Sequence, residues 1–481
     1  MNKKFTPYIL VLFFAVLTFS SCIKDDSIGE INPVSKIEIV GELKPVYSLE
    51  RWQTLKINAP EFKQTNTEKP LSYSWEIDYK EVSKEKNLTY VCEKSGKFLG
   101  RLKVSNEDGF FYKTFEVDVR YSYGNGLYIL ASHDGKTILS YYPEEIEGKS
   151  FELDVYEKNN PFIKLGTQPK TLFFTNTKSE KQVYIATGNP SALYRIDPDL
   201  MIAKNKIDAE EYITFVNHDG VGSVITDIKF IMNKRVADLK STATLITNLR
   251  QQNFQMYFGD IEFSDKFYYW YTPDGRYSNG ELYFDNLNSR MLIYSGGKPR
   301  GEEFSEIFPN TFKDKKAIDF CYAGKKNELA GIFRDKTKDT FYLCWFTPGY
   351  YNQWSPKTEI KPEIKYNAIM PNSSGITESA IITSSPAKNI LYYSSKNNVY
   401  AYSILSKGNY PSAPNFVCGN ADESIASMLV SKDESKLYVG TNVKTGNLKG
   451  SLYCFDINNN TLLWKKEKVT GEIVQLDYRY N

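Results

Sequence analysis

The chain has 481 residues, of which 25% are charged and 41% are hydrophobic; this balance is typical of a soluble globular protein with two or three domains. Lys and Arg number 60 against 58 Asp and Glu, and the resulting net charge of +2 argues against the strongly basic surface of a nucleic-acid-binding protein. Tyr and Phe number 36 and 29, an aromatic content that favours strands and binding surfaces.

The chain begins with a short apolar run behind two lysines. Lys3 and Lys4 precede "YILVLFFAVLTF" (8–19), which is the order of the charged and apolar regions of a signal peptide. Twelve helical residues reach about 18 Å, too short for a hydrocarbon core of about 30 Å. We therefore expect a cleaved signal peptide over residues 1–21 rather than a permanent membrane span.

The residues after this run are Ser20, Ser21 and Cys22, followed by "IKDD". They resemble the lipobox of bacterial lipoproteins, with Phe19 where Leu is usual. The resemblance implies that the signal is cut before Cys22 and that Cys22 receives lipid. The acidic residues resemble a surface-export signal of certain Gram-negative lipoproteins, which implies a lipid-anchored outer-membrane protein on the cell surface. The alternatives are an ordinary secretory signal with a chance cysteine, and a solvated linker.

Five further cysteines are scattered along the chain without any C-x-x-C spacing. This pattern indicates neither a zinc site nor a disulfide framework, so we expect them to pack as small buried apolar residues. One pair, Cys321 with Cys344, could instead meet across neighbouring strands. The five are Cys92, Cys321, Cys344, Cys418 and Cys454.

A polar stretch and a first β domain come next. Residues 22–35 are polar and contain Pro33, so they are predicted to form a tether. Between residues 36 and 121, alternating apolar segments are separated by turn signals such as "NEDG" (106–109). This pattern predicts a small β-sandwich.

Two segments of this domain carry a family resemblance. "YSWEID" (73–78) and "GKFLGRLKVSNEDG" (96–109) resemble polycystic-kidney-disease-like (PKD-like) domains of immunoglobulin type. The resemblance implies that Trp75 lies on a central strand and packs in the core. The sequence departs from the family by lacking the Gly-Asp-Gly turn after the Trp strand.

From residue 123 to 481 one pattern recurs: a strand ending in Leu-Tyr or Val-Tyr, a short polar break and a second strand. A period of roughly 40 to 50 residues predicts a β-propeller of about seven blades. We expect "EIVQLDYRY" (472–480) to pair with strands near residue 127 and close the ring. The alternative is a large sandwich or two smaller β domains. The clearest copies are "KQVYIATGNPSALYRID" (181–197), "NILYYSSKNNVYAYSI" (389–404) and "KLYVGTNVKTGNLKGSLYCFDI" (436–457).

Catalytic and metal motifs are absent from the sequence. Its two histidines, His133 and His218, both lie in "HDG", which predicts a turn; the alternative is a metal or acid–base role in a propeller loop. No H-E-x-x-H, G-x-S-x-G, P-loop or Rossmann pattern occurs. The segment 450–466 resembles one repeat of a pyrroloquinoline-quinone-type propeller, but a single copy with Trp464 as a packing residue predicts no cofactor. We therefore predict no catalytic residue, no metal and no cofactor.

Two aromatic segments are interpreted as ligand-binding loops of the propeller. They are "KFYYWYTPDGRY" (266–277) and "FTPGYYNQW" (346–354). Flat rings stack on the apolar faces of sugars, so such loops suit glycan capture; the alternative is packing between blades. The candidate ligand-binding residues are Tyr268, Tyr269, Trp270, Tyr271, Tyr350, Tyr351 and Trp354.

The fold class expected is thus all-β, with an N-terminal immunoglobulin/PKD-like sandwich and a C-terminal propeller. The lipoprotein signal and these two domains together resemble PKD-like family lipoproteins, whose genes accompany starch-utilisation-type uptake systems. The resemblance implies a non-catalytic surface accessory that binds a glycan or a peptide/protein ligand beside an outer-membrane transporter complex. The alternative is a propeller enzyme, such as a glycoside hydrolase or lyase that uses carboxylates.

Overall fold

The computed structural model divides the chain into two compact units between Tyr121 and Ser122. No helix in its described part is both long and apolar enough to cross a membrane. The structure describes residues 34–480 with gaps at 51–52, 95, 121–122, 145–149, 177–180, 209–212, 219–226, 233–234, 241–249, 253–261, 263, 265–267, 272–277, 295–303, 325–327 and 350–359.

The first unit is a β-sandwich. One layer is a five-stranded sheet in the order β2-β9-β8-β5-β6, in which β2 runs parallel to β9. The other layer consists of two short pairs, β1 with β4 and β3 with β7. The strands are β1 (Ile37–Ile39), β2 (Val46–Glu50), β3 (Thr54–Ile57), β4 (Phe62–Gln64), β5 (Ser72–Ile77), β6 (Lys80–Ser83), β7 (Leu88–Val91), β8 (Gly96–Asn106) and β9 (Gly109–Arg120).

The core of this unit lies between the two layers and is centred on Trp75. The Trp75 side chain is fully buried, and Leu55 and Leu88 of the short pairs pack in the same cluster as Val117 of the sheet. The indole Nε1 of Trp75 donates to the carbonyl of Glu85 at 3.0 Å, so its polar atom is satisfied inside the core. The predicted core position of Trp75 is confirmed.

The predicted "NEDG" turn is also confirmed. Asn106 pairs with Gly109, so β8 and β9 form a hairpin with a two-residue connection. The side-chain oxygen of Asn106 accepts the backbone N–H groups of Asp108 and Gly109, each at 3.0 Å. An Asn side chain that bonds the backbone two residues further on is a standard way of stabilising a turn.

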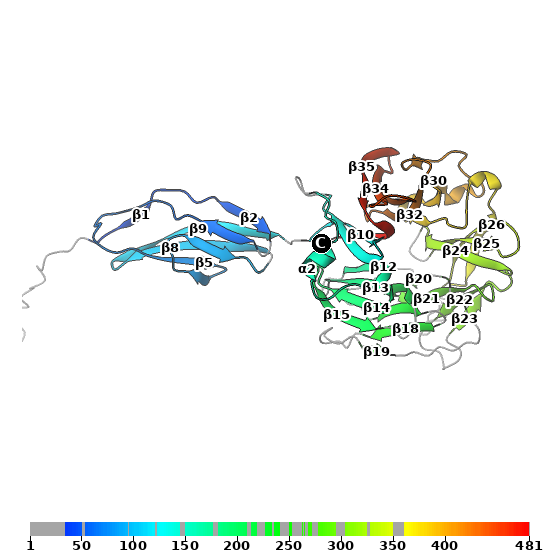
Figure 1. Cartoon of the computed structure of the whole chain (residues 1–481), viewed down its shortest axis with the longest axis horizontal. Helices are drawn as coiled ribbons and strands as arrows, with labels where there is room; N and C mark the ends of the chain where they lie inside the picture. The colour runs from blue at the N-terminus through cyan, green and yellow to red at the C-terminus, as the bar shows by residue number, and fades with distance from the viewer. Residues whose placement is uncertain are drawn as a thin grey trace, which may run out of the picture. The chain divides into compact units, whose positions relative to one another are not determined.

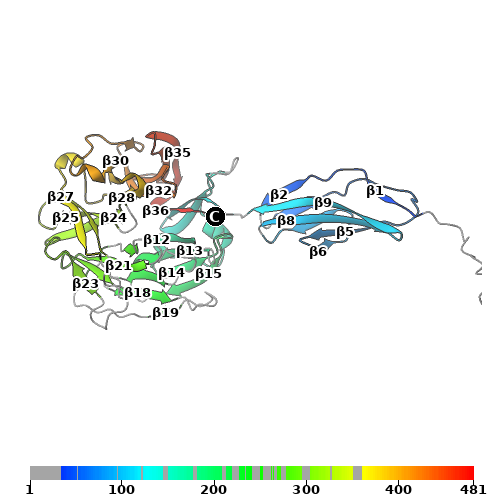
Figure 2. The ribbon, with the colours of Figure 1, turned by 180° about the vertical axis from the view of Figure 1, so that it is seen from behind.

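The second unit contains, in its described part, one three-stranded and six four-stranded antiparallel sheets. Figure 1 and Figure 2 show these sheets arranged around a common centre, with β12 toward the centre and β15, β19 and β23 toward the outside. The first three sheets are made of β10 (Gly126–His133), β11 (Lys136–Tyr142) and β36 (Glu472–Arg479); of β12 (Thr167–Asn176), β13 (Lys181–Asn189), β14 (Ser191–Ile196) and β15 (Ala203–Asp208); and of β16 (Ile213–His218), β17 (Asp227–Met232), β18 (Arg235–Lys240) and β19 (Arg250–Gln252).

Four further sheets follow in chain order, with little helix between them. The described helices are α2 (Val155–Asn159) and the short 3-10 turns η2 (Asn372–Ser374), η3 (Pro386–Lys388) and η4 (Ile404–Ser406). The sheets are made of β20 (Tyr268–Tyr271), β21 (Ser278–Asp285), β22 (Arg290–Tyr294) and β23 (Phe304–Ile307); of β24 (Lys315–Tyr322), β25 (Leu329–Asp335), β26 (Phe341–Thr347) and β27 (Glu363–Ile369); of β28 (Ile382–Ser385), β29 (Ile390–Ser395), β30 (Asn398–Ser403) and β31 (Phe416–Val417); and of β32 (Glu423–Val430), β33 (Lys436–Val443), β34 (Gly450–Asp456) and β35 (Thr461–Thr470).

The prediction of an all-β fold class is confirmed, since the described chain is nearly all-β. Its four-stranded antiparallel sheets are consistent with propeller blades. The predicted closing strand is confirmed as well. β36 pairs antiparallel with β10, and Leu127 lies opposite Tyr478. The first sheet is therefore completed by the last strand of the chain.

Side chains on the first strands join neighbouring sheets. β24 and β32 each have an irregularity in register just before Asp319 and Ser427. Both side chains accept a backbone N–H from a strand of the neighbouring sheet, Asp319 from Ile382 and Ser427 from Leu476, each at 3.0 Å. These bonds satisfy backbone donors at sheet edges that would otherwise lack a partner.

The cysteines of the described residues form no disulfide with one another. The suggestion that Cys321 and Cys344 meet across neighbouring strands is wrong. Cys321 lies on β24 and Cys344 on β26, with β25 between them, and they pack in different core clusters. Burial raises the pKa of the Cys344 thiol to about 12, as expected for a cysteine that serves as a small apolar residue.

Candidate functional site

Several of the predicted functional residues lie outside the part of the chain that the structure describes. This holds for the predicted lipidation site, Cys22, and for Tyr350, Tyr351 and Trp354 of the second aromatic segment. These four assignments stay predictions from the sequence.

The first aromatic segment is corrected from a loop to a strand. Tyr268–Tyr271 form β20, whose residue Tyr268 pairs with Leu282 of β21. Aromatic residues have high β-propensity, which accounts for a strand at these four positions. The side chains of Tyr269, Trp270 and Tyr271 lie outside the described atoms.

Tyr268 itself packs between two sheets. Its hydroxyl donates to the carbonyl of Phe320 on β24, and its ring meets the Tyr322 ring edge-on with centroids 5.3 Å apart. Burial raises the pKa of Tyr268 well above its ordinary value. Tyr268 thus makes the contacts of the alternative interpretation, packing between sheets, and its assignment as a ligand-binding residue stays a prediction.

Exposed aromatic rings occur instead on the outer face of the five-stranded sheet. Side chains alternate along β8 and β9, so one set enters the core and the other faces solvent. Leu102 and Val117 are fully buried, whereas Phe110 and Tyr112 are 61% and 38% exposed, and Tyr79, in the β5–β6 turn, is 69% exposed. Together with two cations these rings form the aromatic–cation strip, which consists of Tyr79, Arg101, Lys103, Phe110 and Tyr112.

Rings and cations alternate along this strip. Lys103 Nζ lies 4.9 Å from the ring centroid of Phe110 and 5.9 Å from that of Tyr112. The guanidinium carbon of Arg101 lies 5.2 Å from the centroid of Tyr112 and 4.9 Å from that of Tyr79. Each cation–π contact contributes about 0.5 to 1 kcal/mol at an exposed site, so the contacts hold exposed rings in place.

The two cations differ in their charge partners. Arg101 forms an ion pair with Glu76, and its Nε donates to Glu76 Oε2 at 2.8 Å. This hydrogen bond is the largest cause of the raised pKa of Arg101. Lys103 has no ion pair with any of the residues that the structure describes. Its ammonium is therefore available to an anionic or hydroxylated ligand.

Sequence reasoning missed this strip, although β9 contained a signal for it. Thr114, Glu116 and Asp118 occupy alternate positions and mark the polar side of the strand. Two-residue steps back along that side reach Tyr112 and then Phe110, which predicts solvent exposure for both rings. The partner lysine and arginine on β8 follow only from the register of the hairpin.

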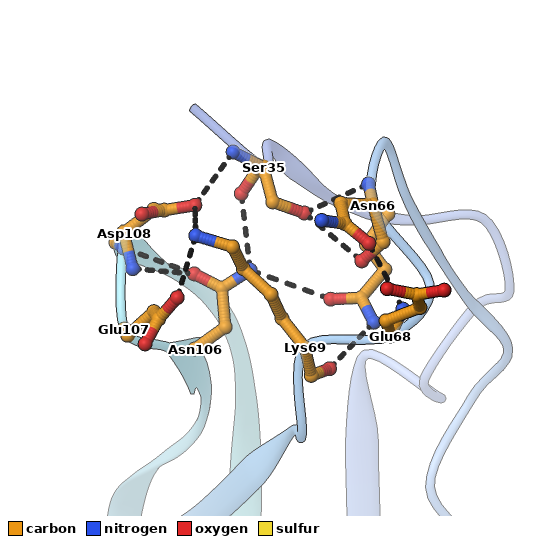
Figure 3. Close-up of polar contacts among 9 residues, drawn as sticks. Ser35, Asn66, Glu68, Lys69, Asn106, Glu107 and Asp108 are labelled. Carbon is orange, nitrogen blue, oxygen red and sulfur yellow. Dashed lines mark hydrogen bonds and ion pairs between the residues drawn. The ribbon is translucent and has the colours of Figure 1, made fainter. Parts of the chain in front are cut away.

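A polar cluster lies at the end of the sandwich where the described chain begins (Figure 3). The backbone N–H of Ser35 donates to Asp108 Oδ2 at 2.8 Å, and Asn106 Nδ2 donates to the carbonyl of Ser35 at 3.0 Å. The backbone N–H of Asn66 donates to Ser35 Oγ at 3.0 Å. Ser35 is thus fixed to the β8–β9 turn by both its backbone and its side chain.

Lys69 supplies the charge of this cluster. Its Nζ lies 2.6 Å from Asp108 Oδ2 and 2.7 Å from Glu107 Oε1. The hydrogen bond from Lys69 lowers the pKa of Asp108, so Asp108 stays ionised as the acceptor for Ser35.

The length of β9 separates this cluster from the other end of the sandwich. β9 runs 12 residues from Gly109 to Arg120, about 37 Å at the usual strand rise. The chain therefore enters and leaves the sandwich at opposite ends.

Within the described ranges, no group of three or more His, Cys, Asp or Glu side chains is placed to hold a metal ion.

Comparisons with known proteins give fold-level matches only. No protein-family model matches the chain, and no curated protein matches it. A quinoprotein alcohol dehydrogenase-like protein from Bacteroides thetaiotaomicron is 14% identical with a TM-score of 0.46, over 92% of this chain and 96% of that chain. A protein from Lactobacillus plantarum is 12% identical with a TM-score of 0.48, over 74% and 100% of the two chains. A lactonase-like protein from Bacteroides fragilis is 10% identical with a TM-score of 0.46, over 74% and 98%. The matches are distant ones to β-propeller proteins and say nothing of this chain's function.

Proposed function

We propose that the protein is a surface-exposed outer-membrane lipoprotein, anchored at Cys22, that captures a glycan without cleaving it. In this proposal it serves as a binding accessory of a nutrient-uptake system, beside an outer-membrane transporter. The observation that carries the proposal is the aromatic–cation strip, because it combines exposed rings with an unpaired ammonium on a rigid sheet.

The chemistry of the strip suits sugars. Phe110 and Tyr112 present apolar rings on which the C–H faces of a sugar stack, and Lys103 donates hydrogen bonds to hydroxyl or acidic groups. Rings fixed by neighbouring cations lose little rotamer freedom on binding, which lowers the entropic cost of association. The Phe110 and Tyr112 rings are inclined at 65°, which favours a single twisted glycan chain over a flat crystalline surface.

The polar cluster supports a role for the first unit as a spacer. In the proposal, the tether runs from Cys22 to Ser35, where the hydrogen bonds to Asp108 and Asn106 fix it. The sandwich, which we take to be PKD-like, then carries the chain about 37 Å further along β9. In the proposal, the chain thus leaves for the second unit, which we take to be a seven-bladed propeller, at the end of the sandwich opposite the tether.

The test is a glycan-binding measurement on the soluble chain that lacks residues 1–22. Wild-type protein is screened by affinity electrophoresis in gels that contain neutral or acidic polysaccharides, and the variants Phe110→Ala and Tyr112→Ala are compared with it. Truncating a central stacking ring removes about 2 kcal/mol, roughly a thirtyfold weakening. Val46→Ala is the matched control, because Val46 is exposed on β2 of the same sheet.

Retardation that is lost in both ring variants and kept in the control supports the proposal. Retardation that persists unchanged in Phe110→Ala and Tyr112→Ala removes the strip as the binding surface. Release of shorter sugars during incubation overturns the non-catalytic assignment, in favour of the carboxylate-based enzyme.

A further inference from the structure

A cavity of about 240 Å³ opens in the first unit beside the β5–β6 turn. Its lining comes from both layers: Tyr90 of β7 and the residues that follow it on one side, and residues of β5, β6, β8 and β9 of the five-stranded sheet on the other. The cavity is lined by Ile77, Asp78, Lys80, Val82, Tyr90, Cys92, Glu93, Lys94, Phe98, Val117 and Val119.

The floor of the cavity is apolar. Ile77, Val117 and Val119 are at most 7% exposed, and they belong to the core cluster around Trp75. Val82 and Phe98 pack against the same cluster and complete the apolar wall. An apolar cavity of about 150 Å³ accommodates a benzene ring, so this floor has room for one large apolar side chain.

The mouth of the cavity carries charges of both signs. Asp78 and Lys80 flank the β5–β6 turn, and Lys94 follows β7 on the opposite side. None of these three side chains makes an ion pair with another described residue. With Glu93, which also lines the cavity, the mouth carries two carboxylates and two ammonium groups above an apolar floor.

Cys92 does not turn this cavity into a covalent site. Its side chain is 3% exposed, and burial raises the pKa of its thiol to about 11. The thiol is therefore protonated at neutral pH, and the thiolate that would be the nucleophile is scarce. A ligand of this cavity is held by contacts alone.

We propose that the cavity binds a small zwitterion with a large apolar side chain, that is, a free amino acid such as phenylalanine. The apolar side chain rests on the floor formed by Ile77, Val117 and Val119. The ammonium of the ligand pairs with Asp78, and its carboxylate pairs with Lys80 and Lys94. This site is distinct from the glycan surface, and it does not depend on glycan binding.

The test is isothermal titration of the soluble chain that lacks residues 1–22 with L-phenylalanine. Three matched probes share the ring: N-acetyl-phenylalanine amide has neither charge, 3-phenylpropionate has the negative charge, and phenethylamine has the positive charge. L-Phenylalanine is expected to bind more tightly than all three. Asp78→Asn and Lys94→Gln are each expected to weaken it about two- to fivefold, as for partly exposed ion pairs.

Val82→Phe tests the cavity itself. Val82 is half-buried on the edge strand β6, so a larger side chain there projects into the space. It is expected to weaken L-phenylalanine at least about tenfold, or 1.4 kcal/mol. Val91→Phe is the matched control, because Val91 is exposed on β7 and does not line the cavity.

Three results would overturn the proposal. Absence of L-phenylalanine binding to the wild type removes the site, and unchanged binding in Val82→Phe places the ligand elsewhere. Equal binding of 3-phenylpropionate or phenethylamine rejects the zwitterion. Should Val82→Phe fail to fold, the two charge variants at the exposed mouth still decide the question. None of these results bears on the glycan proposal, which is measured with other ligands and other variants.

Discussion

The carboxylate of Asp477 accepts the backbone N–H of Phe174 at 3.1 Å, across 303 positions of sequence. The other carboxylate oxygen accepts the N–H of Tyr478 at 2.8 Å. Asp319 makes the same pair of contacts, with Ile382 in the next sheet and with its own neighbour Phe320. Two separate sheets thus use one carboxylate to bridge to the adjoining edge strand, which covers backbone donors that a sheet edge leaves unpaired.

The Asp477 bridge predicts a pH dependence of stability. Desolvation raises the pKa of Asp477 to about 7, above the value of about 3.9 for an exposed Asp. Folding therefore favours the protonated carboxyl, and its contribution is full below about pH 4 and is lost as pH rises through about 7. We therefore expect Asp477 to lower the melting temperature of the wild type as the pH rises from 5 to 8. Asp477→Asn should remove this decrease, as measured by calorimetry.

The matched control for Asp477 is Asp456→Asn. The carboxylate of Asp456 accepts the N–H of Asn458 at 2.7 Å in an exposed turn, and such donors lower its pKa. Its protonation change falls below pH 4, so the control should keep the wild-type slope between pH 5 and 8. A slope that is equal in wild type and Asp477→Asn would contradict the assignment to Asp477.

Arg479 is predicted to be a main stabiliser of ring closure. It is 1% exposed, donates to the carbonyls of Tyr123 and Pro198, and pairs with Asp199. Arg479→Met should cost about 3 to 5 kcal/mol of unfolding free energy, because Asp199 and two carbonyls lose their donor. Chemical denaturation of the full soluble chain measures this.

The control is Arg334→Met, which removes a partly exposed arginine paired with Asp339 and Glu378 on the surface. A surface pair is worth about 0 to 1 kcal/mol. Equal losses in the two arginine variants would show that burial of Arg479 carries no special weight.

Trp75→Ala is predicted to destabilise the first unit without affecting the second. Trp75 belongs to a core cluster that contains residues of the first unit alone. The truncation should cost about 3 to 5 kcal/mol, seen as a lower first transition in calorimetry and an unchanged second one. Leu99→Ala, at an exposed position of the same sheet, should change neither transition. A shift of both transitions in Trp75→Ala would mean that the units unfold together.

Cys22→Ala is predicted to release the protein from the membrane fraction. The lipobox-like sequence before Cys22 implies that Cys22 carries acyl chains. Each CH₂ group of an acyl chain that is buried in the membrane contributes about 0.8 kcal/mol to membrane binding. Fractionation of cells with a high-salt wash measures the distribution. Cys92→Ala, which changes a cysteine of the sandwich core, should stay with the membranes. Retention of the Cys22 variant there would rule out the lipid anchor.

Local patterns were enough to predict part of this structure. Trp75 and the "NEDG" turn follow from alternation and turn chemistry within one hairpin, and the pairing of β36 with β10 follows from the need to close a ring. The strip at Phe110 was missed because its cations come from β8 and depend on register. The hydrogen bond between Asp477 and Phe174 could not be predicted from local patterns, because the sequence around either residue contains no signal for its distant partner.

Closure by β36 has a consequence for how the protein is made. The chain is synthesised from its N-terminus, so the first sheet lacks the strand β36 until residues 472–479 have been made. A truncated chain that lacks these residues would expose the edge of β10, which could then pair with strands of other chains. Because Arg479 contacts the carbonyl of Tyr123, the two ends of the second unit lie together. They could be joined by a short linker, and the unit reopened at a surface turn such as Asp456–Asn459, in a circular permutant.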